Sequence, residues 1–495
     1  LDQDIFNEKN EESLRLLMKE LPSGIAAAVG HVSRNLKDKG KNYFNNVSII
    51  KNSEIIFSQA KTLLPSYDVF DESRYFESSS SREVIEISGV KTGIAICEDL
   101  WHNSPEGLRE GYGDDPVKEL LDKGAQLIIS PAASPFFAGK RKTRFDIIKK
   151  ISRKGSVPVV YVNSVGGNDS LIFDGNSMVF DSSGTLVLSG KGFEEDLFIY
   201  DTGKKYEKID FEENCYSDIE KALVMGLRDY LRKCGFEKVH LGLSGGIDSA
   251  LVAVLAVKAT GRENVKVFAM PSEFSSEGSL TDAEELAVNL GLKLETIPIK
   301  TIYDQYITQL DPFFRGTSFD LAEENLQARI RGTLMMGYSN KWKSLLLTTG
   351  NKSELSTGYC TLYGDMAGGI GIIGDLFKTE VFALCRFINK TYGNIIPEST
   401  ISKPPSAELR PDQKDEDSLP PYPLLDEILK LYIVENRSRD EIVKTGFDDT
   451  VVGMVISLVA RAEHKRVQAP PVLKISPRAF GIGRRVPLAR KLHEN

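Results

Sequence analysis

The sequence has few of the features that mark secreted, membrane-spanning or zinc-stabilised proteins. Its 495 residues include five cysteines, an odd number with no C-x-x-C pair, which argues against a disulfide framework and a structural zinc site. No apolar run approaches the roughly 20 residues that span a bilayer, and no signal-peptide pattern is present. We therefore expect a cytoplasmic protein with no membrane partner.

An excess of positive charge is also absent. Acidic residues outnumber basic ones by 70 to 62, which gives a net charge of −8 and argues against a general nucleic-acid binder. The hydrophobic content of 41% is that of an ordinary globular protein. Because the chain is too long for a single hydrophobic core, we expect two or three domains.

The most informative stretch is Leu241-Gly-Leu-Ser-Gly-Gly-Ile-Asp-Ser249, which we call the glycine loop. It follows an apolar run and leads into an apolar helical pattern, so a strand, a turn and a buried helix are expected. Two adjacent glycines let the backbone approach an anion, and the first turn of the helix supplies N–H donors. Asp248 would repel a bare phosphate, so its presence implies a bridging metal ion, most plausibly Mg²⁺.

The pattern Ser-Gly-Gly-x-Asp-Ser resembles the pyrophosphate-binding loop of the ATP pyrophosphatases. Those enzymes cleave ATP between its α and β phosphates and adenylate a substrate. A glycine-rich turn that merely caps a core helix is the alternative. The resemblance implies ATP binding by Ser244, Gly245, Gly246, Ile247, Asp248 and Ser249.

The first 200 residues alternate strand-like runs with helical patterns, which predicts a layered α/β domain. The first expected element is an amphipathic helix that includes residues 11–20, and a turn is expected at Gly166-Gly167. The expected strands are 24–30, 47–50, 90–97, 125–130 and 157–163.

The run Ile94-Ala-Ile-Cys-Glu-Asp-Leu-Trp101 resembles the nucleophile strand of nitrilase-like amidases, in the branch that forms the glutaminase half of glutamine-dependent NAD synthetases. The resemblance implies that Cys97 attacks the glutamine amide and that Lys61 stabilises the oxyanion. A small core cysteine and a solvated lysine are the alternatives. The same resemblance places four residues in the glutamine pocket, namely Tyr67, Glu98, Trp101 and Ser134, although Glu98 could instead form a structural ion pair.

One part of the nitrilase pattern has no counterpart. The triad glutamate of that family follows an early strand ending in Pro-Glu, and no such segment precedes Leu1. General acid–base assistance is worth roughly 10²–10⁴-fold, so its loss would be large. We expect either an upstream segment, which the absence of an initial Met favours, or a polypeptide that hydrolyses glutamine poorly.

A charged, turn-prone linker is expected at residues 201–216, followed by a helix over residues 217–231 with Ser217 as its N-cap. Beyond the glycine loop, strand patterns at residues 265–270, 293–298 and 344–348 alternate with helices. This order predicts a doubly wound, Rossmann-like domain with ATP at the carboxyl ends of its strands.

Later motifs resemble those of NAD synthetases. Asn325 and Arg329 lie four apart on one expected helix, which alone would suggest an exposed structural face, but the resemblance implies that they bind deamido-NAD. It also implies that Asp365 and Lys403 contact this substrate. ATP contacts are implied for Thr349, Lys378 and Ser406, and Glu354 would be the second Mg²⁺ carboxylate beside Asp248. The Pro-rich segment 402–422, which by composition is a flexible loop, would be a lid.

The resemblance covers essentially the whole chain, which is identified as a member of the glutamine-dependent NAD synthetases. It implies a nitrilase-like α/β sandwich domain (1–200) whose first strand is missing, a linker (201–216) and an adenine-nucleotide α-hydrolase domain (217–495). ATP would adenylate deamido-NAD, and ammonia from L-glutamine, or free ammonia, would displace AMP to give NAD. A homo-oligomer built on synthetase dimers is implied.

Three kinds of alternative remain for the function. GMP synthetases and tRNA-thiolating enzymes share the glycine loop, but the former carry a Cys and His amidotransferase motif that is not evident here, and the latter usually carry paired cysteines and a basic surface. The chain could also be an ammonia-only synthetase. A nucleotide-binding sensor with an inactive amidase half is the alternative from a different class.

Overall fold

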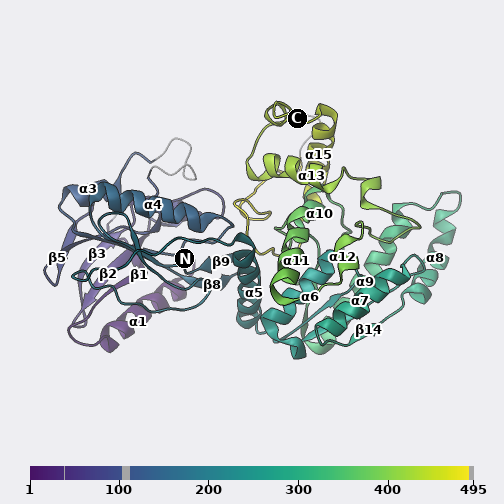
Figure 1. Cartoon of the computed structure of the whole chain (residues 1–495), viewed down its shortest axis with the longest axis horizontal. Coiled ribbons are helices and arrows are strands. Elements are labelled where there is room, and N and C mark those ends of the chain that lie inside the picture. The colour runs from purple at the N-terminus through teal and green to yellow at the C-terminus, as the bar shows by residue number, and fades with distance from the viewer. Residues whose placement is uncertain (38, 103–111, 490–495) are drawn as a thin grey trace. The chain divides into compact units, whose positions relative to one another are not determined.

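The computed structural model describes residues 1–37, 39–102 and 112–489. By its internal contacts the chain divides into two compact units (Figure 1). Unit 1 comprises Leu1–Gly166 and Phe173–Asn214, and unit 2 comprises Gly167–Ile172 and Cys215–Asn495. Each has its own sheets and its own core.

Unit 1 contains two sheets. The first is antiparallel and consists of β1 (Ala26–Arg34), β2 (Tyr43–Lys51) and β3 (Glu54–Ala60). The second is mixed, has the order β11-β10-β7-β6-β5-β4, and is parallel through β5, β6 and β7. Its strands are β4 (Val84–Ile87), β5 (Val90–Ile94), β6 (Leu127–Ala132), β7 (Val159–Asn163), β10 (Met178–Phe180) and β11 (Leu186–Ser189).

Helices cover the outer faces of these sheets. α1 (Asp4–Glu20) packs on β1, whereas α3 (Pro116–Asp122) and α4 (Lys140–Gly155) pack on β5, β7 and β10, so they lie on opposite sides of the strands (Figure 1). Val47 and Ile49 of the first sheet pack on Ile94 and Ile96 of the second to form the core between them. The result is a four-layer α/β sandwich, as the sequence predicted.

Unit 2 is built on a parallel sheet of order β14-β13-β12-β15-β16. Its strands are β12 (Lys238–Gly242), β13 (Val265–Ala269), β14 (Leu294–Thr296), β15 (Ser344–Thr348) and β16 (Ile370–Gly371). The chain winds from β12 to β14 in one direction and then returns to place β15 on the other side of β12. Ligands bind at such a switch point in doubly wound sheets, which here lies between β12 and β15.

Helices flank this sheet as the alternation of patterns predicted. α6 (Ile247–Thr260) and α7 (Glu277–Asn289) pack on β13, α9 (Leu321–Trp342) packs on β12 and β15, and α5 (Cys215–Cys234) packs on α6. α6 is buried along most of its length because its residues are almost all apolar. The remaining larger helices are α8 (Lys300–Phe314), α10 (Lys352–Thr357), α11 (Lys378–Tyr392), α13 (Tyr422–Leu429) and α15 (Asp449–Arg461).

Two local predictions are wrong. α5 begins at Cys215, so Ser217 lies inside its first turn and is not the N-cap. Gly166 and Gly167 lie within β8 (Val165–Asn168), which pairs with β9 (Leu171–Asp174). The turn falls on Asp169, whose φ of 51° shows that aspartate supplies the left-handed residue. No helix in the described part of the chain combines the length and apolarity that crossing a bilayer requires.

Candidate functional sites

The candidate nucleophile of unit 1 lies on a tight turn. Cys97 directly follows the extended residues after β5, begins a short 3₁₀ helix (Cys97–Leu100), and has a φ of 47°. Left-handed backbone is costly for a residue with a Cβ, so the surrounding structure must impose it. The half-buried thiol is thereby presented beyond the carboxyl end of β5.

Lys61 and Glu72 form a buried ion pair beside this turn. Lys61 is 2% exposed, and its Nζ lies 2.7 Å from Oε1 of Glu72, whose other oxygen accepts a 3.2 Å hydrogen bond from Asn45. Burial opposes the positive charge of Lys61, but Cys97 and Glu72 outweigh it and raise the pKa of this lysine. Burial raises the pKa of the Cys97 thiol although Lys61 opposes the shift. Thiol, ammonium and carboxylate therefore occupy one electrostatically coupled site.

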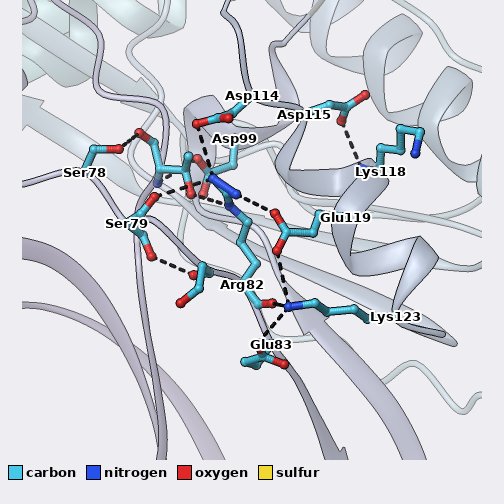
Figure 2. Close-up of polar contacts among 12 residues, drawn as sticks. Ser78, Ser79, Arg82, Glu83, Asp99, Asp114, Asp115, Lys118, Glu119 and Lys123 are labelled. Atoms are coloured by element: carbon cyan, nitrogen blue, oxygen red, sulfur yellow. Dashed lines mark hydrogen bonds and ion pairs between the residues drawn. The ribbon is translucent and has the colours of Figure 1, made fainter.

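Asp99 connects the nucleophile turn to the segment that carries Lys61. Its carboxylate accepts the backbone N–H groups of Thr62 at 3.0 Å, Leu63 at 2.8 Å and Ile96 at 3.0 Å. Arg82 supports the same segment by donating to the Thr62 hydroxyl at 2.9 Å while its guanidinium pairs with Glu119. Figure 2 shows Arg82 with its acidic partners Asp114 and Glu119, and Asp99 beside it.

The residues predicted for the glutamine pocket lie in three places: Tyr67 contacts Glu98, Trp101 lies beside Lys140, and Ser134 contacts Asn163. Glu98 accepts hydrogen bonds from the hydroxyls of Tyr67 at 2.9 Å and Tyr112 at 2.8 Å, and burial raises its pKa. Trp101 is buried with the Nζ of Lys140 lying 5.4 Å from its ring centroid.

Ser134 is buried at the end of β6, where its N–H donates to the side chain of Asn163 at 2.9 Å. The structure therefore brings Tyr67 to Glu98 directly. Ser134 is fixed by a neighbouring strand.

The glycine loop of unit 2 has the geometry that close approach to an anion requires. Gly245 has a φ of 76°, and a Cβ placed on it would lie 2.1 Å from the carbonyl oxygen of Ser279. Ser244 accepts from Gly246 N–H at 3.2 Å, and the Ser249 hydroxyl donates to the Gly246 carbonyl at 3.0 Å. The loop is thus tightened by its own serines and opens onto the N-terminus of α6.

Two carboxylates converge at the switch point, one from each side. Nζ of Lys378 lies 2.5 Å from Oδ2 of Asp248 and 3.3 Å from Oε1 of Glu354. Asn351 caps α10 and donates to Oδ1 of Asp248 at 2.9 Å. Burial disfavours the charge on Lys378, but the two carboxylates outweigh it and raise its pKa. Burial and the charge of Asp248 raise the pKa of Glu354.

A cavity of about 340 Å³ extends from the glycine loop across the carboxyl ends of the strands. Most of the predicted ATP and dinucleotide residues line it: Ser244, Gly246, Ile247, Asp248, Ser249, Thr349, Glu354, Asp365, Lys378, Lys403 and Ser406. Gly245, Asn325 and Arg329 do not line it. Asn325 accepts from the Thr361 hydroxyl at 2.7 Å, and Arg329 donates to the Leu362 carbonyl at 3.3 Å, so both hold the loop that precedes Asp365.

The expected lid is ordered against α7. Glu408 accepts from the hydroxyls of Ser276 at 2.9 Å and Ser279 at 2.6 Å, at the N-terminus of that helix. Lys403 lies 3.6 Å from Asp282, and the Ser406 hydroxyl donates to the Gln413 carbonyl at 2.6 Å. These contacts fix the segment as one wall of the cavity.

Several site residues were missed in the sequence. Glu72, Asp99, Lys140 and Asn351 each lie close to an identified motif, but nothing in the spacing of the first three distinguishes them from ordinary polar residues. Asn351 offered the best signal, since an Asn three residues before Glu354 forms a capping box.

Family models match both units. A carbon-nitrogen hydrolase model matches residues 8–205, and an NAD synthase model matches residues 219–469, about half of the chain. The boundaries that we predicted at residues 200 and 216 stay predictions.

Known proteins resemble the chain over its length. It is 46% identical to the glutamine-dependent NAD(+) synthetase of Synechocystis sp. over 99% of this chain and 89% of that protein, and 41% identical to the protein of the same name from Thermotoga maritima over 95% and 86%. A solved structure of glutamine-dependent NAD+ synthetase from Acinetobacter baumannii, in complex with ADP, is 37% identical with a TM-score of 0.75, and covers 100% of this chain and 89% of that one.

Proposed function

Since the chain belongs to the glutamine-dependent NAD(+) synthetases, we propose that it makes NAD by ATP-dependent amidation of deamido-NAD, with ammonia drawn from glutamine. One observation carries this most directly. The glycine loop after β12 and helix α10 after β15 meet at the switch point of the parallel sheet, where Asp248, Glu354 and Lys378 face one cavity.

In the first step an oxygen of the nicotinate carboxylate attacks the α-phosphorus of ATP, and the bond to the β-phosphate oxygen breaks. Pyrophosphate leaves into the glycine loop, at the N-terminus of α6, where the helix dipole favours an anion. Lys378 offsets negative charge on the leaving group. Ammonia then attacks the activated carbonyl, AMP leaves, a proton is lost, and the amide of NAD remains. Deamido-NAD contacts are assigned to Asn325, Arg329, Asp365 and Lys403, and ATP contacts to Thr349 and Ser406.

Two carboxylates suit a divalent cation beside the triphosphate. The ammonium of Lys378 already lies between Asp248 and Glu354, which shows that the site accommodates positive charge. Within the described residues no group of three or more acidic, His or Cys side chains has metal-binding geometry, so phosphate oxygens and water would complete the shell. Mg²⁺ bound by Asp248 and Glu354 would neutralise charge on the phosphates.

In unit 1 the Cys97 thiolate attacks the glutamine amide carbon, and the Lys61 ammonium stabilises the oxyanion. The proton lost by the thiol passes to the amide nitrogen, which leaves as ammonia, and water later releases glutamate from the thioester. Tyr67, Glu98, Trp101 and Ser134 are assigned to glutamine binding. A cytoplasmic location and a homo-oligomer built on synthetase dimers complete the proposal.

The test compares NAD formation from deamido-NAD, ATP and Mg²⁺ with either glutamine or ammonium as nitrogen donor. Cys97→Ala should abolish glutamine-dependent synthesis and spare ammonium-dependent synthesis, because the thiol serves only the amidase. Asp248→Ala should abolish both, because adenylation is common to them.

Each unexpected result has a distinct meaning. Glutamine use that survives Cys97→Ala would overturn the amidase assignment. Activity of the unsubstituted chain with ammonium alone would favour the ammonia-only synthetase, and activity with neither donor would favour the nucleotide-binding sensor.

A further inference from the structure

Arg331 lies on the face of α9 that lines the nucleotide cavity. Ala328, Arg331, Gly332 and Met335 follow one another at spacings of three, one and three residues, which places them along one side of the helix, and all four line the cavity. The helix approaches the loop before Asp365 closely, since a Cβ on Gly332 would lie 2.8 Å from the Tyr363 carbonyl oxygen. The close packing of α9 therefore fixes the backbone of Arg331 at the wall of the cavity.

The guanidinium of Arg331 is anchored at one end and unpaired at the other. Its Nε donates to the carbonyl of Met270 at 3.0 Å, and its terminal nitrogens form no hydrogen bond or ion pair with any residue that the structure describes. Burial lowers the pKa of Arg331 to about 10, and the charges of Glu408 and Asp365 oppose this shift without reversing it. Arg331 is half-buried, and a partly desolvated cation without a partner is less favourable than one whose charge a ligand neutralises.

The other cations of the cavity differ in this respect. Lys378 is paired with Asp248 and Glu354, and Lys403 lies within 4 Å of both Asp282 and Glu408. Among the described residues that line the cavity, only Arg331 combines a full positive charge with no ion pair.

The surroundings of Arg331 connect the two substrate regions. Met270 directly follows β13, the neighbour of the strand that carries the glycine loop. Asp365 belongs to the dinucleotide side of the cavity, and Glu408 lies on the lid at the start of α7. Arg331 lines the cavity together with Met270, Asp365 and Glu408, so its part of the wall borders both the region proposed for ATP and the region proposed for the dinucleotide.

The proposed reaction needs a cation at that junction. It brings a carboxylate nucleophile up to a polyanionic triphosphate, and the two repel each other. Lys378 and the acidic pair serve the pyrophosphate end of the cavity, next to the glycine loop. The α-phosphoryl group and the incoming carboxylate require positive charge of their own.

We propose that Arg331 binds the α-phosphoryl group of ATP as the dinucleotide carboxylate attacks it, and so acts as a catalytic residue of adenylation. The carboxylate oxygen forms the new bond to the α-phosphorus, the bond to the bridging oxygen breaks, and pyrophosphate carries away the electron pair. Arg331 neither gives nor takes a proton. The inference rests on the proposed function, since it assigns a role within that reaction.

The test measures pyrophosphate release from ATP and deamido-NAD at saturating ammonium, with kcat and the KM for ATP determined separately. Arg331→Gln should lower kcat by about 10²-fold, as removal of one charge-stabilising donor does, with the KM for ATP changed less than about threefold. Arg331→Lys should recover part of the loss, because lysine keeps the charge but lacks the planar fork. Arg262→Gln, at an exposed arginine of the same unit, is the matched control.

Two results would overturn this proposal alone. One is a kcat for Arg331→Gln within about threefold of the Arg262→Gln control. The other is a lowered melting temperature that Arg331→Lys fully restores together with activity, since packing would then suffice. A rise in the KM for ATP that accompanies the unchanged kcat of the first result would assign Arg331 to ground-state binding. No pyrophosphate from the unsubstituted protein would instead overturn the proposed function, and this inference with it.

Discussion

At the scale of single residues, the pair of Lys61 and Glu72 gives the amidase site a carboxylate that the motifs did not identify. The 2.7 Å contact keeps the lysine charged and directs its ammonium, while Asn45 holds the second carboxylate oxygen. An oriented cation next to a thiol favours the thiolate and receives negative charge in the transition state. Glu72 therefore acts on the reaction through Lys61.

We predict that Glu72→Gln lowers glutamine-dependent NAD formation by about 10²-fold, the lower end of what a positioned acid–base group contributes. The amide still accepts a hydrogen bond from Lys61 but no longer supplies a charge. Ammonium-dependent synthesis should stay within about twofold of normal. Glu83→Gln, which removes an exposed partner of Lys123, is the control. Equal rates for both variants with glutamine would show that the charge of Glu72 is dispensable.

Gly245 is a position where the glycine loop has no room for a side chain. A Cβ there would lie 2.1 Å from the Ser279 carbonyl oxygen, and the φ of 76° is unfavourable for alanine. Gly245→Ala should reduce ATP affinity and synthesis with either nitrogen donor by at least about tenfold, because the loop must move. Calorimetric titration with ATP checks this. Gly278→Ala, where a Cβ meets nothing within 4 Å, should bind ATP normally.

Motifs predicted some residues of the sites because the relevant chemistry lies within a few positions of chain. Cys97 and Glu98, or Ser244 to Ser249, are adjacent and carry their function together. Asp99 and Arg331 could not be recognised because their roles depend on partners that lie far away in sequence, at Thr62 and Met270. A carboxylate or guanidinium of this kind looks in the sequence like any surface charge.

At the scale of elements, the start of α10 and the segment before α11 are joined by a fully buried ion pair. Nζ of Lys352, at the start of α10, lies 2.8 Å from Oδ1 of Asp375, and both side chains are 0% exposed. The other oxygen of Asp375 accepts the N–H groups of Ile475 at 2.8 Å and Ser476 at 2.7 Å. Glu354 follows Lys352 by two residues and Lys378 follows Asp375 by three, so this pair fixes the spacing of the proposed metal and phosphate groups.

We predict that Asp375→Asn lowers the unfolding free energy of unit 2 by about 3–5 kcal/mol, because it leaves the Lys352 charge buried without a counterion. The expected cost of Lys352→Met with Asp375→Asn is smaller than the sum of the two single changes. Urea unfolding of the two single variants and the double variant gives the coupling energy. Additive costs would mean that the ion pair does not couple the two segments.

The sequence predicted the long, periodic elements well and the short ones poorly. β15 was placed at its observed bounds because three consecutive leucines stand between polar ends. β3 and β4 were not predicted, since the first residues of β3 are exposed although Ile55, Ile56 and Phe57 are apolar, and a glutamate interrupts the four residues of β4. The turn assigned to Gly166-Gly167 was wrong because Asp169 adopts the left-handed conformation instead.

At the scale of the whole molecule, the α/β class followed from alternating strand and helix patterns, which are a property of long segments. The order of the two halves followed from the resemblance of their motifs. The assignment of Gly167–Ile172 to unit 2 could not be predicted. It depends on contacts such as the 2.7 Å hydrogen bond from Gly167 N–H to Asp229 and the 2.8 Å bond from Lys474 N–H to the Ser170 carbonyl. These pairs are separated by tens to hundreds of residues.

His240 couples the stability of unit 2 to pH. The fully buried ring lies in β12, with Nε2 at 3.0 Å from the Met335 carbonyl of α9 and Nδ1 at 2.9 Å from the Ser344 hydroxyl of β15. A carbonyl can only accept, so Nε2 carries the hydrogen and Nδ1 accepts from serine. Burial lowers the pKa of His240 and keeps the ring neutral in the fold.

We predict that unit 2 loses stability as the pH falls below about 6.5, the ordinary pKa of histidine, because the unfolded chain then takes up a proton that the folded chain resists. The slope contributed by one such group is at most about 1.4 kcal/mol per pH unit, and it vanishes above pH 7 or so.

His240→Gln can keep both hydrogen bonds without titrating, so its stability should fall less steeply between pH 6.5 and 5. Introducing Trp101→Phe into both proteins leaves Trp342 as the single tryptophan, so its fluorescence reports urea unfolding of unit 2. The measurement then excludes the contribution of His31 in unit 1, whose pKa is also lowered by burial. Parallel stability profiles for the two proteins would show that another group governs the acid limb, whereas convergence of the profiles toward low pH would assign it to His240.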